Sequence, residues 1–232
     1  MSTSSVSNAR GPTKFSTDCR ACPRLAVFLD EVRSTQPHYH ALPVASFGDV
    51  KARLLIVGLA PGMHGANCTG RPFTGDYAGD LLYSTLHHYG FATSPDALDA
   101  AGNANLKLTL KDCRITNAVR CLPPQNKPEP SEVRQCNGYL QSELAGLPQG
   151  AAVLALGTVA HGAVLRALGL RAKDFAFAHN ARHALPDGRV LYDSYHCSRY
   201  NTNTKRLTVA MFHAVFDGIK QHLSQAYSKF MP

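Results

Sequence analysis

The chain has 232 residues, of which 44% are hydrophobic and 17% charged, and its 24 Lys and Arg against 16 Asp and Glu give a net charge of +8. This composition excludes a disordered body, and the longest apolar run, residues 54–63, is too short and too interrupted by Gly and Pro to cross a membrane. The basic balance favours an anionic partner, nucleic acid above all; a generic basic protein is an alternative of about equal weight from charge alone. Because the N-terminus lacks an apolar core, we expect a cytoplasmic protein with a flexible tail over residues 1–17; a transit peptide is the alternative.

The first predicted element is a helix that Pro23 opens, since Leu25, Phe28, Leu29 and Val32 recur at helical spacing. Residues 37–50 are expected to be a loop. The further predicted strands are 53–58, 113–119, 151–156 and 189–195; the further helices are 76–89, 131–147, 158–168 and 205–225; the loops are a Gly-rich segment at 62–75, a Pro-rich one at 121–130 and a polar one at 196–204.

Strands that alternate with helices predict an α/β protein. We expect a three-layer α/β/α sandwich with a central, mainly parallel four-stranded sheet, forming one domain over residues 18–232. Ligands of such sheets bind beyond the carboxyl ends of the strands. The site is therefore expected in the loops at 58–76, 117–130, 157–158 and 196–204.

Seven cysteines, an odd number in a chain without a secretion signal, argue against a disulfide framework and favour thiols as ligands. Cys19 and Cys22 form a C-x-x-C pair, and Cys121 and Cys136 could complete a set of four thiolates. Zinc and an iron–sulfur cluster both fit such a set. Buried structural cysteines or a redox pair are the alternatives.

Several residues of the strand-end loops have side chains suited to binding a flat, polar ring. Phe73 is a candidate stacking platform, Asn117 offers an amide that reads a base edge, and His196 can donate to a developing negative charge. Each also has a simpler interpretation: a core aromatic, a turn residue and an ordinary core or surface histidine. Asp76 likewise suits the N-cap of the following helix.

These residues belong to motifs that together resemble the uracil-DNA glycosylase superfamily, and family 5 most closely. The motifs, in chain order, are Gly58-Leu-Ala-Pro-Gly62, Gly70-Arg-Pro-Phe-Thr-Gly-Asp76, Thr116-Asn-Ala-Val-Arg-Cys121 and His196-x-Ser-x-x-Asn-Thr202, together with the four spaced cysteines. Family 4 has an acidic residue where this chain has Leu59. The resemblance extends over residues 19–225.

The resemblance implies a DNA repair enzyme that flips a deaminated base out of DNA and hydrolyses its N-glycosidic bond. It implies Asp76 and His196 as catalytic residues, Leu59, Ala60, Phe73 and Asn117 as base contacts, and Arg199 and Tyr200 as DNA contacts. Cys19, Cys22, Cys121 and Cys136 would hold a structural [4Fe–4S] cluster. The partner would be double-stranded DNA carrying uracil or hypoxanthine, with single-stranded DNA as an open alternative, bound by a monomer. A basic edge at the loop and helix of residues 121–136 would help to position phosphates. The sequence has one basic segment in this region, which contains Arg114, Arg120, Lys127 and Arg134.

One departure from the family pattern is Cys197, which stands where relatives usually have Pro after the motif histidine. Without the fixed φ of Pro, we expect a looser His196 loop and an oxidisable thiol near the site. Two functions compete with the glycosylase: a protein that binds damaged or abasic DNA with little turnover, and a zinc-stabilised nucleic-acid-binding domain. A nucleotide-binding enzyme is disfavoured because both phosphate-loop patterns are absent.

Overall fold

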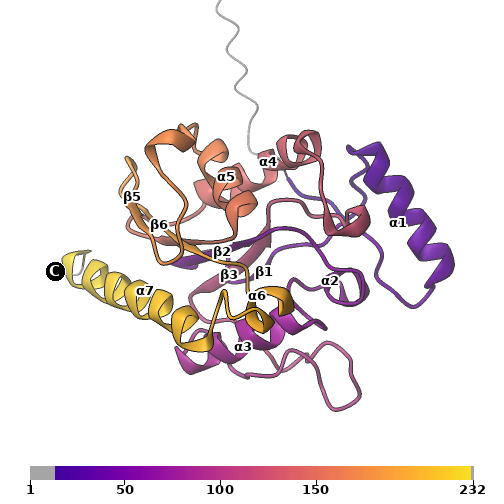
Figure 1. Cartoon of the computed structure of the whole chain (residues 1–232), viewed down its shortest axis with the longest axis horizontal. Coiled ribbons are helices and arrows are strands. Elements are labelled where there is room, and N and C mark those ends of the chain that lie inside the picture. Colours follow the sequence, from indigo (N-terminus) through magenta and orange to yellow (C-terminus); the bar gives the residue numbers. More distant parts are fainter. Residues whose placement is uncertain (1–13, 231–232) are drawn as a thin grey trace, which may run out of the picture.

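The computed structural model describes residues 14–230, so most of the predicted N-terminal tail lies outside the described residues. The described helices and strands alternate along the chain (Figure 1). The strands are β1 (Phe47–Gly48), β2 (Leu54–Gly58), β3 (Cys113–Asn117), β4 (Ala152–Leu156), β5 (Arg182–Ala184) and β6 (Val190–Ser194). The helices are α1 (Pro23–Thr35), α2 (Ala66–Thr69), α3 (Tyr77–His88), η1 (Pro124–Asn126), α4 (Pro130–Ala145), α5 (Thr158–Ala167), η2 (Ala172–Asp174), α6 (Arg199–Asn203) and α7 (Val209–Phe230).

The central sheet has the strand order β1-β3-β2-β4-β6-β5. The four strands predicted from the sequence, β2, β3, β4 and β6, pair in parallel and form the middle of the sheet, as expected. The prediction missed both edge strands, which pair antiparallel and comprise only two and three residues. Such short strands have no periodic pattern of their own, because pairing with a longer neighbour is what makes them extended.

Two helical layers cover the sheet, which confirms the three-layer sandwich. Leu54 and Ile56 of β2 pack with residues of α3 and α7, whereas Leu55 and Val57 pack with residues of α4 and α5. In Figure 1, α3 and α7 lie on one side of the sheet and α4 and α5 on the other. Every residue of β2, β4 and β6 is buried. Continuous apolar strands are expected where both faces of a parallel sheet are covered.

Two loops predicted to be irregular contain short helices. The Gly-rich loop holds α2, and the polar loop after β6 holds α6, whose N-cap Ser198 accepts a hydrogen bond from the Asn201 backbone N–H. The closing helix begins at Val209 rather than at Lys205, where φ is +56°. Among the described residues, no helix has the length and apolar character of a membrane span.

Candidate active site

A pocket of about 800 Å³ lies beyond the carboxyl ends of β2, β3 and β6, where parallel sheets bind their ligands. Eight residues singled out in the sequence line it together: Leu59, Ala60, Phe73, Asp76, Asn117, His196, Arg199 and Tyr200. They come from segments separated by up to about 140 positions. The parallel register brings these segments to one edge of the sheet.

Asp76 caps α3 and lines the pocket with the same side chain. Its Oδ1 accepts a hydrogen bond of 2.9 Å from the Gly79 N–H. A Cβ atom at Gly65 would lie 2.4 Å from the Asp76 Oδ2, so this loop position needs glycine to approach the carboxylate. Burial raises the pKa of Asp76, although the backbone N–H groups of Gly79 and Ala78 oppose this rise. The N-cap interpretation and the pocket interpretation therefore both hold.

The rings of Phe73 and His196 face each other across part of the pocket. Their centroids are 5.9 Å apart and their planes differ by 26°. Phe73 is largely buried and has a φ of +52°, a conformation that only a well-determined loop imposes on an aromatic residue. Burial lowers the pKa of His196 to about 4. The imidazole is therefore neutral at pH 7 and can donate one hydrogen bond.

Asn117 brings an unpaired acceptor to the pocket. Its side chain is buried, and its Oδ1 has no hydrogen-bond partner in residues 14–230. A Cβ atom at Gly58 would lie 2.3 Å from this oxygen and 2.6 Å from the Phe73 Cζ, so the glycine makes room for both side chains. A buried acceptor without a partner is costly, which indicates that a ligand supplies the donor.

Arg199 and Tyr200 lie on α6 at the mouth of the pocket. Tyr200 is 71% exposed, and the Arg199 guanidinium carbon is 5.4 Å from the centre of the Tyr77 ring. Arg206 also lines the pocket, with its guanidinium 4.6 Å from the Tyr195 ring. An aromatic ring and two cations therefore flank an apolar pocket.

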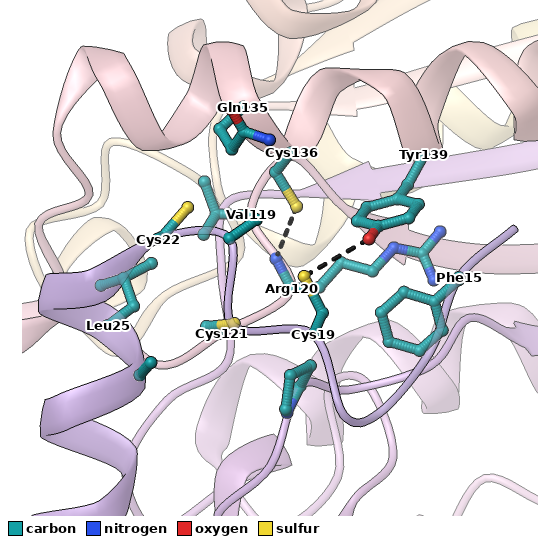
Figure 2. Close-up of a pocket in the computed structure, with 13 residues that line it drawn as sticks. Phe15, Cys19, Cys22, Leu25, Val119, Arg120, Cys121, Gln135, Cys136 and Tyr139 are labelled. Atoms are coloured by element: carbon teal, nitrogen blue, oxygen red, sulfur yellow. Dashed lines mark hydrogen bonds between the residues drawn. The ribbon is translucent and has the colours of Figure 1, made fainter. Parts of the chain in front are cut away.

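A second pocket contains the four cysteines predicted to act as ligands (Figure 2). Cys19 and Cys22 lie just before and at the N-cap of α1, Cys121 follows β3, and Cys136 lies on α4. Leu25, Val119 and other apolar side chains surround them. The three segments meet there although about 100 residues separate the first pair from the second.

The surroundings of Cys121 and Cys136 disfavour a free thiolate, and two of the four sulfurs have hydrogen-bond donors. Burial first, and then the charges of the neighbouring cysteines, raise the pKa of Cys121 to about 12. Burial also raises the pKa of Cys136 to about 11. The Arg120 N–H donates to the Cys136 Sγ at 3.4 Å, and the Tyr139 hydroxyl donates to the Cys19 Sγ at 3.3 Å (Figure 2). Four thiols so arranged are suited to a cationic metal group that offsets their charge, as a metal deprotonates its thiol ligands.

The model of the Uracil DNA glycosylase superfamily matches residues 45–220 of the chain. The chain belongs to this superfamily. A type-5 uracil-DNA glycosylase of Thermus thermophilus is 46% identical over 201 residues, which cover 84% of this chain and 90% of that protein. A type-5 uracil-DNA glycosylase of Mycobacterium leprae is 42% identical over 212 residues, or 88% of this chain and 90% of that protein. A type-4 uracil-DNA glycosylase of Pyrobaculum aerophilum is 32% identical over 136 residues, covering 58% and 59%.

These comparisons confirm the assignment of this superfamily member to the type-5 branch. The type-5 relatives match most of the chain, whereas the type-4 similarity extends over little more than half of it. The alignments of 201 and 212 residues are longer than the stretch from Cys19 to Thr202 that contains the sequence motifs. Membership in the branch therefore rests on the whole domain rather than on one motif.

Two arginines of the basic segment formed by Arg114, Arg120, Lys127 and Arg134 are paired inside the fold of this glycosylase-family chain. Arg114 and Arg120 are turned inward and bind the carboxylate of Glu143. Burial would raise the pKa of Glu143, but hydrogen bonds from Arg114, Ser46 and Arg120 lower it to about 2. The cause is tertiary, because Glu143 lies on α4 and is remote in sequence from both arginines.

Other residues of the pocket, among them Asn126 and Arg206, were not singled out in the sequence as site residues. Asn126 reaches the pocket from η1, where Gln125 and Asn126 have φ angles of +56° and +57°. Arg206 reaches it from the start of the closing segment. Their position in the sequence could have indicated them, because both residues follow the carboxyl end of a strand. The Pro-rich loop, however, gave no reason to prefer Asn126 over its neighbours.

Cys197 differs from the expectation of an oxidisable thiol. Its side chain is fully buried, and the Sγ donates to the Ala78 carbonyl oxygen at 3.4 Å. Burial first, and then the nearby Asp76 charge, raise the pKa of this thiol, so the reactive thiolate is disfavoured. The contact joins the residue after His196 to the first turn of α3, which Asp76 caps. The loop therefore has a tertiary anchor in place of the rigidity of Pro.

Proposed function

We propose that the chain is a monofunctional DNA glycosylase that removes uracil, and other deaminated bases such as hypoxanthine, and leaves an abasic site. The observation that carries this proposal is the meeting of four chemically different groups in one pocket: a stacking ring, an unpaired amide oxygen, a carboxylate and a neutral imidazole. The names of the type-5 relatives support it. Each group corresponds to one requirement of base excision.

Recognition begins when the damaged nucleotide is turned out of the helix, because its sugar carbon is inaccessible in the stack. Phe73 would stack on the flipped base. The unpaired Oδ1 of Asn117 would accept a hydrogen bond from the imide N–H of uracil, and this bond would supply the partner that the oxygen lacks. The backbone at Leu59 and Ala60 would line the same pocket.

The bond that breaks joins the base nitrogen to C1′ of the sugar, and its electron pair leaves with the base. His196, neutral at pH 7, would donate a hydrogen bond to the base as it gains negative charge. Asp76 would stabilise the positive sugar and orient the water whose oxygen forms the new bond to C1′. The surplus proton of that water would end on the departing base or in solvent.

The breadth of the substrate range would follow from an apolar lining. Leu59 has a hydrocarbon side chain. An acidic side chain at this position would accept only bases with a matching hydrogen-bonding pattern. A purine such as hypoxanthine needs more room than uracil but offers the same kind of amide edge. The pocket of about 800 Å³ provides this room.

The four cysteines would hold a [4Fe–4S] cluster, which supplies a structural cross-link between the start of α1, the end of β3 and α4. The Arg120 N–H and the Tyr139 O–H, which donate to two of the sulfurs, support this proposal, because hydrogen bonds to ligand sulfurs accompany iron–sulfur clusters. No step of the hydrolysis depends on the cluster.

The partner would be duplex DNA, bound by a monomer in the cytoplasm, on the nucleoid in a bacterial cell. Arg199 would contact a phosphate near the flipped nucleotide, and the exposed Tyr200 would insert into the gap that the base leaves. Binding should then weaken steeply with salt, because each phosphate contact releases counterions.

The test is an assay of duplexes carrying uracil or hypoxanthine, in which hot alkali reveals abasic sites. Asp76→Asn keeps an oxygen that can accept the Gly79 N–H and removes the negative charge. We expect a rate at least about 100-fold below that of the parent protein, as for loss of one electrostatic group at a reaction centre. Asp80→Asn, one turn further along α3, is the matched control and should retain activity.

The outcomes separate the competing functions. Strand breaks that appear only after alkali establish a monofunctional glycosylase. Tight binding of damaged DNA without abasic product would favour the damage-binding protein. Full activity of Asp76→Asn would refute the proposed catalytic role of this carboxylate, and capping of α3 would then be its only role.

A further inference from the structure

Two histidines and one aspartate meet behind the end of β6, outside the pocket described above. His161 comes from α5, His183 from β5 and Asp193 from β6. The His161 Nδ1 is 2.8 Å from the Asp193 Oδ1, and the His183 Nε2 is 3.0 Å from the Asp193 Oδ2. The ligand atoms of all three lie within 4.8 Å of one another. Asp193 has no exposed surface, and only 5% of the His161 side chain is exposed.

The hydrogen bond of the His161 Nε2 determines whether the His161 Nδ1 carries a hydrogen in the neutral ring. The His161 Nε2 is 2.9 Å from the Phe175 carbonyl oxygen. A carbonyl oxygen only accepts, so this nitrogen carries a hydrogen. In the neutral ring the Nδ1 then presents a lone pair toward a carboxylate oxygen at 2.8 Å. Two lone pairs at this distance require a cation between or beside them.

We propose that His161, His183 and Asp193 bind a divalent transition metal, with Zn²⁺ as the favoured ion. Zinc accepts imidazole nitrogen and carboxylate oxygen in a tetrahedral arrangement. Its histidine ligands commonly donate the remaining ring N–H to a backbone carbonyl, which is the contact of His161 with Phe175. The side chain of His183 is 15% exposed, so a water molecule can reach the fourth position.

Zinc binding needs an adjustment of this geometry. Ligand atoms around a tetrahedral zinc are about 3.3 Å apart. The two nitrogen–oxygen distances, which involve different oxygens of Asp193, must open by a few tenths of an ångström, and the two nitrogens, which lie within 4.8 Å of each other, must reach the same spacing. His183 lies on β5, a three-residue edge strand that pairs with a single neighbour, β6.

The metal would fasten the segment between η2 and β5 over the strand that leads to His196. Phe175 and Phe177 pack against the two histidines. From the same segment, His179 stacks on Tyr195, with ring centroids 5.1 Å apart. The site is therefore structural, and it does not depend on the proposed glycosylase activity.

A proton is the competing occupant. Burial disfavours charge on His161, but its hydrogen bond to Asp193 and the charge of Asp193 outweigh this and raise the pKa of His161. An imidazolium would satisfy the same carboxylate without a metal. The experiment must therefore identify the ion and not only the contact.

The test uses the full chain and its His183→Gln variant, in which the amide keeps a donor near Asp193 but is not a zinc ligand. His222→Gln is the matched control, because His222 is half-buried and bonds a backbone carbonyl, that of Gly150, away from this cluster. Zinc content, zinc X-ray absorption and melting temperature are measured before and after addition of ZnCl₂. The absorption data separate nitrogen and oxygen ligands at about 2.0–2.1 Å from cysteine sulfur at about 2.3 Å.

We expect one zinc with nitrogen and oxygen ligands in the parent protein and in His222→Gln. Zinc at 100 times its dissociation constant should raise their melting temperature by about 5–10 °C. His183→Gln should lose both the ion and the shift. Zinc bound only to sulfur, zinc content unchanged in His183→Gln, or a doubly protonated His161 ring in ¹⁵N NMR at pH 8 with zinc present would each overturn the proposal.

Discussion

The substitution Gly58→Ala tests whether the base-binding groups are held as precisely as the structure indicates. Gly58 ends β2, and an added Cβ would lie 2.3 Å from the Asn117 Oδ1 and 2.6 Å from the Phe73 Cζ. Both atoms are at the far ends of their side chains. The fold can therefore accommodate the methyl group only by displacing the atoms that are proposed to contact the base.

The size of the effect follows from these distances. To reach an ordinary contact of 3.4 Å, the Asn117 oxygen must move by about 1 Å, and the Phe73 ring by nearly as much. A misplacement of about 1 Å in a reacting complex can lower the rate about 100-fold. The cost of overpacking to stability is about 1–3 kcal/mol, so the variant should still be folded at 25 °C.

The assay is single-turnover excision of uracil from a duplex, with alkaline cleavage of the product and a thermal melt of the protein. Gly162→Ala is the control, because a Cβ at this position of α5 meets nothing within 4 Å. We expect a rate about 100-fold lower for Gly58→Ala and an unchanged rate for the control. A folded Gly58→Ala protein with a rate within about threefold of the parent would refute the close packing of Asn117 and Phe73 as the basis of base recognition.

Three further predictions concern stacking, pH and the buried ion pairs. Phe73→Ala should weaken base capture by about 1–3 kcal/mol, measured as kcat/KM at limiting DNA; unchanged capture would make the ring a core residue only. The pKa of His196 in the folded protein is about 4, below its ordinary value of 6.5, so the free energy of unfolding should fall as the pH drops from 6.5 toward 4. In urea titrations His196→Asn should show a weaker pH dependence than the parent protein. An equal pH dependence of the two proteins would contradict the lowered pKa. The pKa of Glu143 is lowered from 4.5 to about 2, so the ionised carboxylate should contribute about 3 kcal/mol to the free energy of unfolding at pH 7, and this contribution should be lost as the pH falls from 4.5 to 2. Glu143→Gln should remove the contribution and leave Arg114 and Arg120 without their carboxylate. A melting temperature that is unchanged at pH 7 would show that these ion pairs do not affect stability.

Much of the candidate site was predictable because its residues directly follow strands. Apolar runs such as residues 54–58 identify buried parallel strands, and their carboxyl ends must share one edge of the sheet. Asn117 and His196 were therefore expected to meet although almost 80 residues separate them. The four cysteines were expected to meet for a different reason, since their spacing resembles a known ligand pattern.

Other features were not predictable because a partner remote in sequence creates them. The sequence could not choose between cap and pocket for Asp76, and the structure shows that one oxygen caps α3 while the side chain lines the pocket. The edge strands β1 and β5 exist only through their neighbours. Cys197 was expected to be exposed to oxidation, but α3 covers it.

The amino-acid sequence by itself determined the order of the four central strands and the longer helices, the branch of the superfamily, and the residue types available at the strand ends. These properties depend on local periodicity and on short motifs, which can be recognised without knowing which distant residues they contact. Only the tertiary structure decided which charges are paired. Arg114 and Arg120 belong to a basic segment of the sequence, but Glu143 neutralises them inside the fold. The meeting of His161, His183 and Asp193 is also tertiary, because α5, β5 and β6 each contribute one of these side chains and only folding brings them within 4.8 Å of one another.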